Sequence, residues 1–157
     1  MHLATESKKI PERDKAVKHK SLEHDACPVA RSLEVAGDAW SMLVVRDAFA
    51  GKRRFGEFQR SLGAAKNILT VRLKKLVALG VLEQVPATDG SAYHEYVLTQ
   101  KGRGLFLVLV ALGQWGCEAS EFKLVDRKKG KAARLELRSE NGRRLGLGEV
   151  RLVNPEA

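Results

Sequence analysis

The chain has 157 residues, of which 44% are hydrophobic and 30% are charged, so we expect one globular domain rather than a disordered chain. The net charge of +9 favours polyanionic partners, namely DNA, RNA or an anionic membrane surface. No apolar run reaches the roughly 18 residues of a transmembrane helix. The two cysteines, Cys27 and Cys117, form neither a disulfide framework nor a zinc-binding spacing. Charge alone does not choose among these partners. The other features argue against a transmembrane helix and favour a cytoplasmic protein, for which we expect no membrane partner, metal or other cofactor.

The first part of the chain is predicted to be a charged arm followed by two helices. Residues 1–26 are polar and nearly free of large apolar groups, which is typical of a mobile N-terminal arm. Pro28 suits the first position of a helix, and Asp38 can cap a second helix that runs to about Ala50. The main domain is expected to span residues 27–122.

The middle of the chain has the pattern of a helix-turn-helix followed by a hairpin. A short helix over residues 54–62 and a longer helix over 66–79 are separated by a tight turn at Gly63. Two alternating segments, 81–85 and 93–98, are rich in β-formers and enclose a turn signal, Asp89-Gly90. A β-hairpin directly after a helix-turn-helix is a wing.

The end of the chain is predicted to hold a dimerisation helix and a tail. The helix over residues 99–122 is apolar on every side, so it must be buried on every side, most simply against a second copy. Residues 123–157 form a tail with a turn signal at Asn141-Gly142, which predicts a β-hairpin. The expected fold is therefore mainly α: a homodimeric winged helix-turn-helix with a C-terminal β-hairpin appendage.

The helix 66–79 has the chemistry of a recognition helix. Three leucines lie on one face, and an amide, a hydroxyl, a branched aliphatic group and two ammonium groups lie on the other. Amides, hydroxyls and methyl groups can contact base edges in the major groove, whereas lysine and arginine can hold phosphates. The predicted DNA-binding residues are Arg53, Arg54, Lys66, Asn67, Thr70, Val71, Lys74 and Lys75.

The charge distribution supports the same interpretation. Residues 51–80 contain eight cations and a single anion, Glu57, so the positive charge is concentrated at the helix-turn-helix. The alternatives are a solvated charged face on a structural helix, and a winged-helix module for RNA or protein contacts. The loop between the two wing strands favours the second alternative, because it carries no cation.

The sequence resembles the HxlR family of bacterial winged helix-turn-helix regulators. The stretches that carry the resemblance are CPVARSLEVAGDAWSMLVVRDAF, RRFGEFQRSLG, KNILTVRLKKLVALGVLEQV and YVLTQKGRGLFLVLVALGQWG, in family order. The resemblance implies a homodimeric transcription regulator, more often a repressor, that dimerises through its first and last helices. Each subunit would insert a recognition helix into a pseudo-palindromic operator. The chain departs from the family at the wing tip, where it has Asp89 instead of an arginine. It also lacks the cysteine pairs that some longer tails use for zinc.

The effector that the family resemblance implies is a thiol oxidant or a small molecule. Cys27 precedes Pro28 at a helix start, where the helix dipole and amide donors stabilise a thiolate. Some family members sense oxidants through a cysteine at this position, so Cys27 is either a redox sensor or a packed thiol. Trp40 and Trp115 are core or interface aromatics, or line a pocket for a small aromatic or electrophilic effector. No enzyme is expected, because the sequence shows no phosphate-cradling loop, metal cluster or nucleophile–base arrangement.

Overall fold

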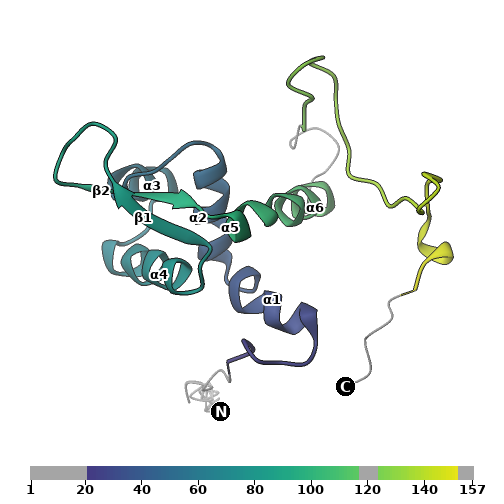
Figure 1. Cartoon of the computed structure of the whole chain (residues 1–157), viewed down its shortest axis with the longest axis horizontal. Helices are drawn as coiled ribbons and strands as arrows, with labels where there is room; N and C mark the ends of the chain where they lie inside the picture. The colour runs from purple at the N-terminus through teal and green to yellow at the C-terminus, as the bar shows by residue number, and fades with distance from the viewer. Residues whose placement is uncertain (1–20, 117–123, 152–157) are drawn as a thin grey trace, which may run out of the picture.

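The computed structural model describes residues 21–116 and 124–151, in which four helices precede a two-stranded sheet (Figure 1). These helices are α1 (Pro28–Ala36), α2 (Ala39–Phe49), α3 (Phe55–Leu62) and α4 (Lys66–Ala78). The sheet and the later helices are β1 (Leu82–Pro86), β2 (His94–Leu98), α5 (Gln100–Gly104), α6 (Phe106–Gly116) and the 3₁₀ helix η1 (Leu147–Glu149). The predicted order of elements is confirmed through the wing.

Helix boundaries follow the capping residues that the sequence offers. Pro28 occupies the first turn of α1, where its missing N–H costs no hydrogen bond. The Asp38 carboxylate accepts a hydrogen bond from the Ser41 N–H at 2.9 Å, which caps α2. Gly63 ends α3 with φ of +60°, a left-handed conformation that favours glycine. The chain then turns through Ala64 and Ala65 into α4.

The core lies where α2, α3 and α4 meet the sheet. The inner face of α4 is buried through Leu69, Leu73 and Leu76. Their partners in the core cluster are Val44, Val45, Phe58, Val81 and Leu82. Burying these side chains, at about 1.5–3 kcal/mol each, fixes α4 on the domain and leaves its other face to solvent.

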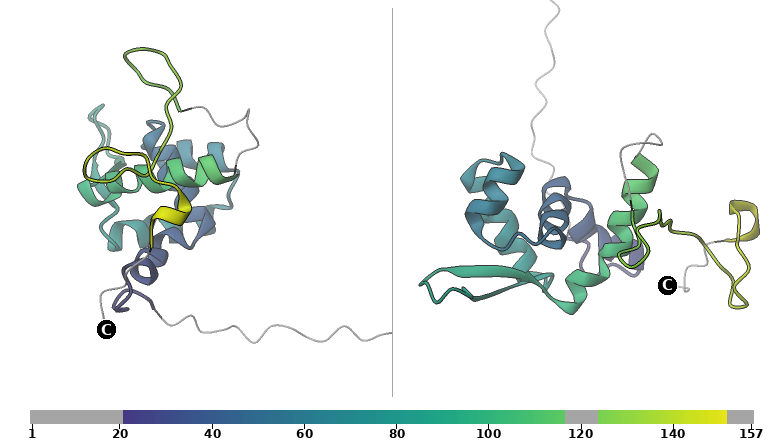
Figure 2. Two further views of the ribbon diagram at one scale, coloured as in Figure 1. Left: turned by 90° about the vertical axis from the view of Figure 1, so that its right-hand side faces the viewer. Right: turned by 90° about the horizontal axis from the view of Figure 1, so that it is seen from above.

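The wing is the antiparallel pair β1–β2, with Leu82 opposite Leu98 and Pro86 opposite His94. Gly90, with φ of +74°, lies in the connecting loop and confirms the predicted turn. The hairpin loop extends from the helices at one end of the domain, and the C-terminal tail lies at the other end (Figures 1 and 2).

The predicted long helix over residues 99–122 is wrong in one respect, because it is divided at Leu105 into α5 and α6. Two glycines, Gly102 and Gly104, weaken the first turns, since glycine has low helix propensity. Gly102 is also buried close to β1, where an added Cβ would lie 2.1 Å from the Val81 carbonyl oxygen. Residues 117–122 of the prediction lie outside the described residues.

The prediction of a C-terminal β-hairpin is also wrong, because residues 124–151 form no regular strands. Residues 124–151 instead form two loops, each closed by one isolated antiparallel bridge, Val125–Ala132 and Arg138–Arg144. The predicted turn at Asn141-Gly142 lies inside the second loop, and Gly142 has φ of +83°. The expected second strand bends instead into η1, where the Glu149 carboxylate accepts the Gly146 N–H at 2.8 Å.

Candidate nucleic-acid interface

The outer face of α4 is open to solvent. Asn67 and Lys74 are exposed, and Val71 keeps 57% of its surface accessible. Thr70 is half-buried, and its hydroxyl donates to the Lys66 carbonyl oxygen at 2.7 Å. Its oxygen can therefore still accept a hydrogen bond, while its proton is already used within the helix. The face combines one amide, one branched aliphatic group and one ammonium group, which suits a major groove.

Ile68 was missed by the sequence analysis, although it belongs to the same surface. It is 40% exposed. Counting 100° per residue places it well away from Leu69, and this signal was available in the sequence. An exposed isoleucine beside Val71 gives the surface a second group that can meet a thymine methyl.

Two cations of α4 are paired with acids of the preceding helices. The Lys75 ammonium lies 3.0 Å from a Glu34 carboxylate oxygen of α1. Arg72, which the sequence analysis did not select, lies 3.0 Å from Asp38 at the N-cap of α2. These pairs hold α4 against α1 and α2, and they partly neutralise the positive edge of the helix.

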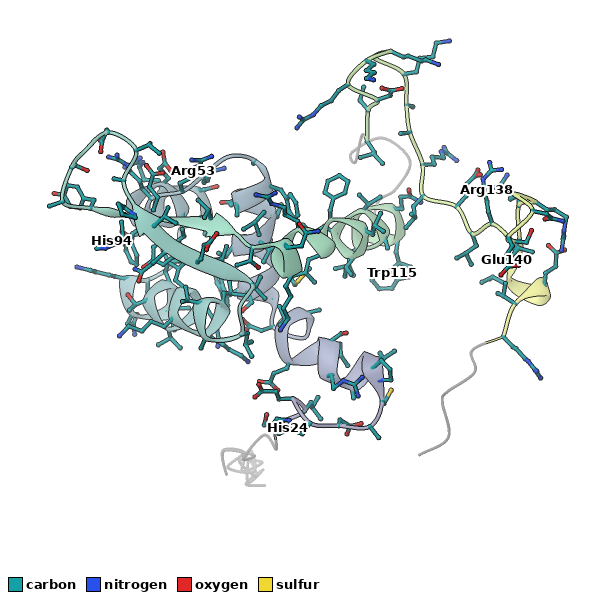
Figure 3. All side chains as sticks on the ribbon, in the orientation of Figure 1. His24, Arg53, His94, Trp115, Arg138 and Glu140 are labelled. Carbon is teal, nitrogen blue, oxygen red and sulfur yellow. The ribbon has the colours of Figure 1, made fainter. Side chains whose placement is uncertain are left out.

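Both predicted arginines before α3 form ion pairs with carboxylates of the wing, and Figure 3 labels Arg53 near the wing. The Arg54 guanidinium lies 2.5 Å from Asp89 and 3.7 Å from Glu95, and Arg53 lies 3.6 Å from the other Glu95 oxygen. Arg53 also accepts the Tyr96 N–H on its carbonyl at 2.8 Å, so the backbone runs beside β2. Three residues of the wing, Asp89, Glu95 and Tyr96, thus contact the start of α3.

Glu95 is the buried centre of this cluster, with only 3% of its surface exposed. One carboxylate oxygen accepts hydrogen bonds from the N–H and the hydroxyl of Thr88, at 3.4 and 3.2 Å. The other oxygen has only Arg53 nearby as an ionic partner among the described residues. A buried carboxylate needs such compensation, so Glu95 constrains both arginines.

Glu57 closes the N-terminus of α3. Its carboxylate accepts the backbone N–H groups of Arg53 and Arg54 at 2.8 and 2.9 Å. These two hydrogen bonds lower the pKa of Glu57 from its ordinary value, because they stabilise the charged form. The single anion of the basic segment is therefore a structural cap.

The predicted DNA-binding residues therefore fall into two groups. Lys66, Asn67, Thr70, Val71 and Lys74 are brought together on α4, and neither of the two lysines has an ion-pair partner among the described residues. Arg53, Arg54 and Lys75 are engaged by acids that lie far away in the sequence. Sequence counting found the cations of residues 51–80 but could not find the acids that partner them.

Cys27 is the N-cap residue of α1 and is half-buried. Its N–H donates to the Asp25 carboxylate at 2.8 Å. The Arg31 guanidinium donates to the carbonyl oxygens of Asp25 and Ala26, directly before the cysteine. The thiol is free, and Cys117 lies outside the described residues.

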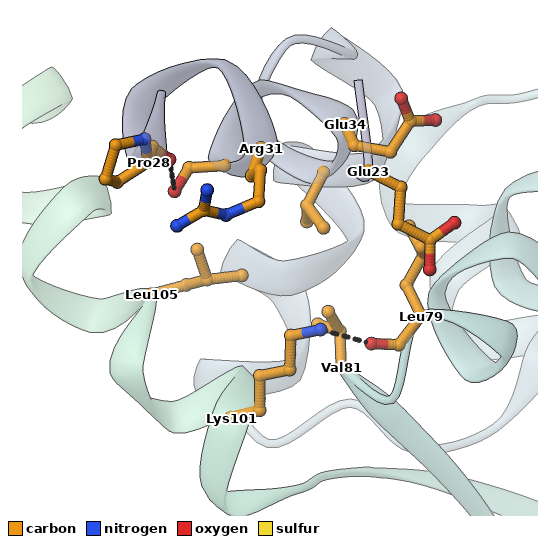
Figure 4. A pocket seen from close by; sticks show the side chains of 10 residues that line it. Glu23, Pro28, Arg31, Glu34, Leu79, Val81, Lys101 and Leu105 are labelled. Carbon is orange, nitrogen blue, oxygen red and sulfur yellow. Dashed lines mark hydrogen bonds between the residues drawn. The ribbon is translucent and has the colours of Figure 1, made fainter. Parts of the chain in front are cut away.

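A hollow of about 420 Å³ lies between α1, the end of α4 and α5 (Figure 4). Val35 and Val81 form its buried floor, and Arg31 and Lys101 lie at its rim. The Lys101 ammonium donates to the Leu79 carbonyl oxygen at 2.7 Å, which links α5 to the C-terminal end of α4. Neither tryptophan of the predicted effector pocket lines this hollow.

Trp40 and Trp115 are instead surface residues of the single subunit, 38% and 87% exposed. Trp115 belongs to an apolar face of α6 that also carries Leu107 and Leu112, 59% and 47% exposed. No helix among the described residues is long and apolar enough to cross a bilayer. In the same part of the chain, no group of three His, Cys, Asp or Glu side chains is arranged to hold a metal ion.

Residues 35–123 match the model of the HxlR-like helix-turn-helix family. The chain belongs to this family. It is 44% identical over 103 residues to MT3179 of Mycobacterium tuberculosis, which is named as an HTH-type transcriptional regulator. The match covers 66% of this chain, which spans about 65% of the length of that curated relative.

Solved structures give the same family context. PA1607, assigned as a transcription factor, is 50% identical with a TM-score of 0.78, and the match covers 87% of this chain and 100% of that one. The redox regulator HypR in its oxidised form is 30% identical with a TM-score of 0.53, over 62% of this chain and 100% of that one. The chain accordingly has the winged helix-turn-helix fold of the HxlR-like family, and the relatives MT3179 and PA1607 are named as a transcriptional regulator and a transcription factor.

Proposed function

We propose that the chain is a sequence-specific repressor that binds a pseudo-palindromic DNA operator as a homodimer. The observation that carries the proposal is the outer face of α4, where Asn67, Val71 and Lys74 stand exposed opposite three buried leucines. Asparagine can pair bidentately with adenine, and lysine can hold a phosphate or a guanine edge. A bound dimer at a promoter represses by blocking polymerase.

Base recognition is assigned to Asn67, Thr70 and Val71, and phosphate contact to Lys66 and Lys74. Arg53, Arg54 and Lys75 contribute in this proposal only when a phosphate replaces their carboxylate partners. Exchange costs least for the pairs of Arg54 with Asp89 and of Lys75 with Glu34, because the two cationic side chains are 38% and 32% exposed and exposed ion pairs are weak. The contacts of Arg53 and Arg54 with the buried Glu95 are costlier to replace. The wing tip itself offers Asp89 to DNA, so we assign it no direct phosphate contact.

The dimer is proposed from apolar surface that one subunit leaves open. On α1, Val29 and Leu33 are 62% and 48% exposed, and on α6 the exposed residues include Leu107, Leu112 and Trp115. Large apolar side chains left exposed on a helix face mark an interaction site in a soluble protein. An isologous contact through α1 and α6 would place two recognition helices for two half-sites.

The response to a signal is proposed to pass through α1. Cys27 occupies the N-cap position of this helix, and Glu34 on the same helix pairs with Lys75 of α4. In this proposal the pair passes a movement of α1 to the recognition helix. The relative HypR is a redox regulator, which supports a thiol-oxidation signal, and a small aromatic or electrophilic effector is the alternative. Cys27→Ser should abolish an oxidation response and leave binding of the reduced protein unchanged.

The proposal is tested by selecting duplexes from a random pool with the full-length protein. Enrichment of a two-fold symmetric motif is the expected result, with half-sites about one helical turn apart. Enrichment of single-stranded RNA over duplex DNA would instead support the second candidate, a winged-helix module for RNA, which the cation-poor wing tip favours. No enrichment of either would contradict both.

A further inference from the structure

The first loop of the C-terminal tail is closed by hydrogen bonds of its own backbone. Its ends are joined by the Val125–Ala132 bridge and by a hydrogen bond from the Asp126 N–H to the Lys131 carbonyl at 2.9 Å. Inside the loop, the Gly130 N–H donates to the Asp126 carbonyl at 2.8 Å, and Gly130 has φ of +64°. These hydrogen bonds close the backbone of the loop, and its side chains project from that backbone. Glycine suits position 130, because it adopts a positive φ readily.

The Asp126 carboxylate of this loop accepts hydrogen bonds from backbone N–H groups. Asp126 Oδ1 accepts the N–H groups of Lys128 and Lys129, at 2.8 and 3.4 Å. Four exposed cations remain, and none has a carboxylate within ion-pair distance among the described residues: Arg127, Lys128, Lys129 and Lys131. We call residues 126–131 the basic loop.

The second loop of the same tail provides an internal comparison. Its arginines are all paired, Arg138 and Arg144 with Glu136 at 3.0 and 3.6 Å, and Arg143 with Glu149. The two loops are closed in a similar way, but only the cations of the second loop form ion pairs with described residues. The cations of the basic loop therefore differ from those of the second loop in having no carboxylate partner among the described residues.

Another feature of the tail is its position in the molecule. The tail lies at the end of the molecule opposite to the wing, beyond α6 (Figures 1 and 2). Its connection to α6 includes the Gln114 side chain, which accepts the Leu135 N–H at 2.5 Å and donates to the Leu135 carbonyl at 3.3 Å. The side chains of the basic loop are all exposed to solvent.

We propose that the basic loop is a second DNA-binding site, which holds backbone phosphates of a duplex segment other than the one that α4 of the same subunit contacts. Unpaired lysine and arginine side chains on a fixed loop suit phosphates of any sequence. DNA is favoured over an anionic membrane because residues 127–131 carry no apolar side chain to insert among lipids. The inference rests on the proposed function, since a second contact to the same polymer raises the effective concentration of the first.

The test compares Lys128→Gln/Lys129→Gln with the matched control Arg143→Gln/Arg144→Gln, both in the full-length protein. Both variants remove two positive charges from the same tail, but only the first removes unpaired ones. Affinity for a mixed-sequence duplex is measured by anisotropy at several salt concentrations. We expect the slope of log K against log salt to fall by roughly 0.9 for each phosphate that the first variant no longer binds. The control should keep the wild-type slope.

Three outcomes would overturn the inference. An unchanged slope in Lys128→Gln/Lys129→Gln would show that the loop does not touch DNA, and an equal fall in the control would show a general charge effect. Loss of binding to phosphatidylserine vesicles or single-stranded RNA, with the duplex slope unchanged, would assign the loop to that partner. Failure of the proposed function is separate, because it appears as absent sequence preference, which a mixed-sequence duplex does not measure.

Discussion

Arg54 and Asp89 form an ion pair of 2.5 Å that joins the start of α3 to the tip of the wing. Hydrogen bonds from Ser91 and from the Arg54 guanidinium hold the pKa of Asp89 well below its usual range. The same pair raises the pKa of Arg54. The Asp89 carboxylate at the wing tip thus pairs with Arg54, whose guanidinium could otherwise bind a phosphate.

Replacing Asp89 with Asn should strengthen binding to DNA of any sequence. Arg54 would keep only the longer ion pair with Glu95, at 3.7 Å, so its guanidinium could turn toward a phosphate. One added phosphate contact should steepen the slope of log K against log salt by about 0.9. Anisotropy titrations on a mixed-sequence duplex measure this change. The gain must disappear in Asp89→Asn/Arg54→Gln, and a gain that persists without Arg54 would contradict the explanation.

Acidification gives an independent check of the same pair. Because the pKa of Asp89 is depressed in the folded protein, its pairing is present above the ordinary aspartate pKa and is lost only as pH falls through the lowered value. Lowering the pH from about 7 to about 5 should therefore not reproduce the slope of Asp89→Asn, since ordinary aspartates titrate near 3.9.

The close approach of α5 to β1 predicts a severe effect of Gly102→Ala. The new Cβ would lie 2.1 Å from the Val81 carbonyl oxygen, so the backbone must shift at a cost of roughly 1–3 kcal/mol. Gly104→Ala is the matched control, because nothing lies within 4 Å of its added Cβ. Urea unfolding should show a lower free energy of unfolding for the first variant only. Equal stability of the two variants would refute this packing.

The capping role of Glu57 predicts a pH-dependent loss of stability in Glu57→Ala. Removing the acceptor of two backbone N–H groups should cost about 1 kcal/mol at neutral pH. The pKa of Glu57 is lowered on folding, so its contribution is full above the ordinary glutamate pKa and is lost as pH falls through the lowered value. The difference between variant and wild type should therefore shrink in acid. The exposed Glu83→Ala should change stability little at any pH.

The apolar face of α6 predicts the oligomeric state. Leu107→Glu/Leu112→Glu should convert a dimer into monomers, because two charges would have to be buried in the contact. Leu147→Glu is the control, since this residue is 90% exposed and lies in the tail. Sedimentation velocity of the three proteins measures the effect. A wild-type monomer, or a dimer that survives the α6 changes, would contradict the proposed interface.

The helices and the wing were predictable because each is specified by neighbouring residues. Pro28, Asp38 and Gly63 mark helix ends, and the leucine spacing of α4 marks its buried face. The break at Leu105 was predicted poorly, because it depends on Gly102 packing against Val81, a contact between separate elements. A long apolar run therefore appeared to be one helix.

The partners of the candidate site residues were not predictable in the same way. Arg54 and Asp89 are 35 residues apart in the chain, and only the fold brings the start of α3 beside the wing tip. Counting charges over residues 51–80 suggested an unopposed basic surface. The structure places acids from α1, α2 and the wing against much of it, and leaves Lys66 and Lys74 without ion-pair partners among the described residues.

The outer face of α4 reads DNA sequence in the proposed function, and Asn67→Ala removes the amide that is assigned to base recognition. Affinities of wild type, Asn67→Ala and Lys74→Ala should be measured by anisotropy on the selected duplex and on a scrambled one. The account predicts that Asn67→Ala loses about 1–3 kcal/mol of preference for the selected duplex. Lys74→Ala should instead weaken binding to both duplexes. Full preference retained by Asn67→Ala would contradict the account.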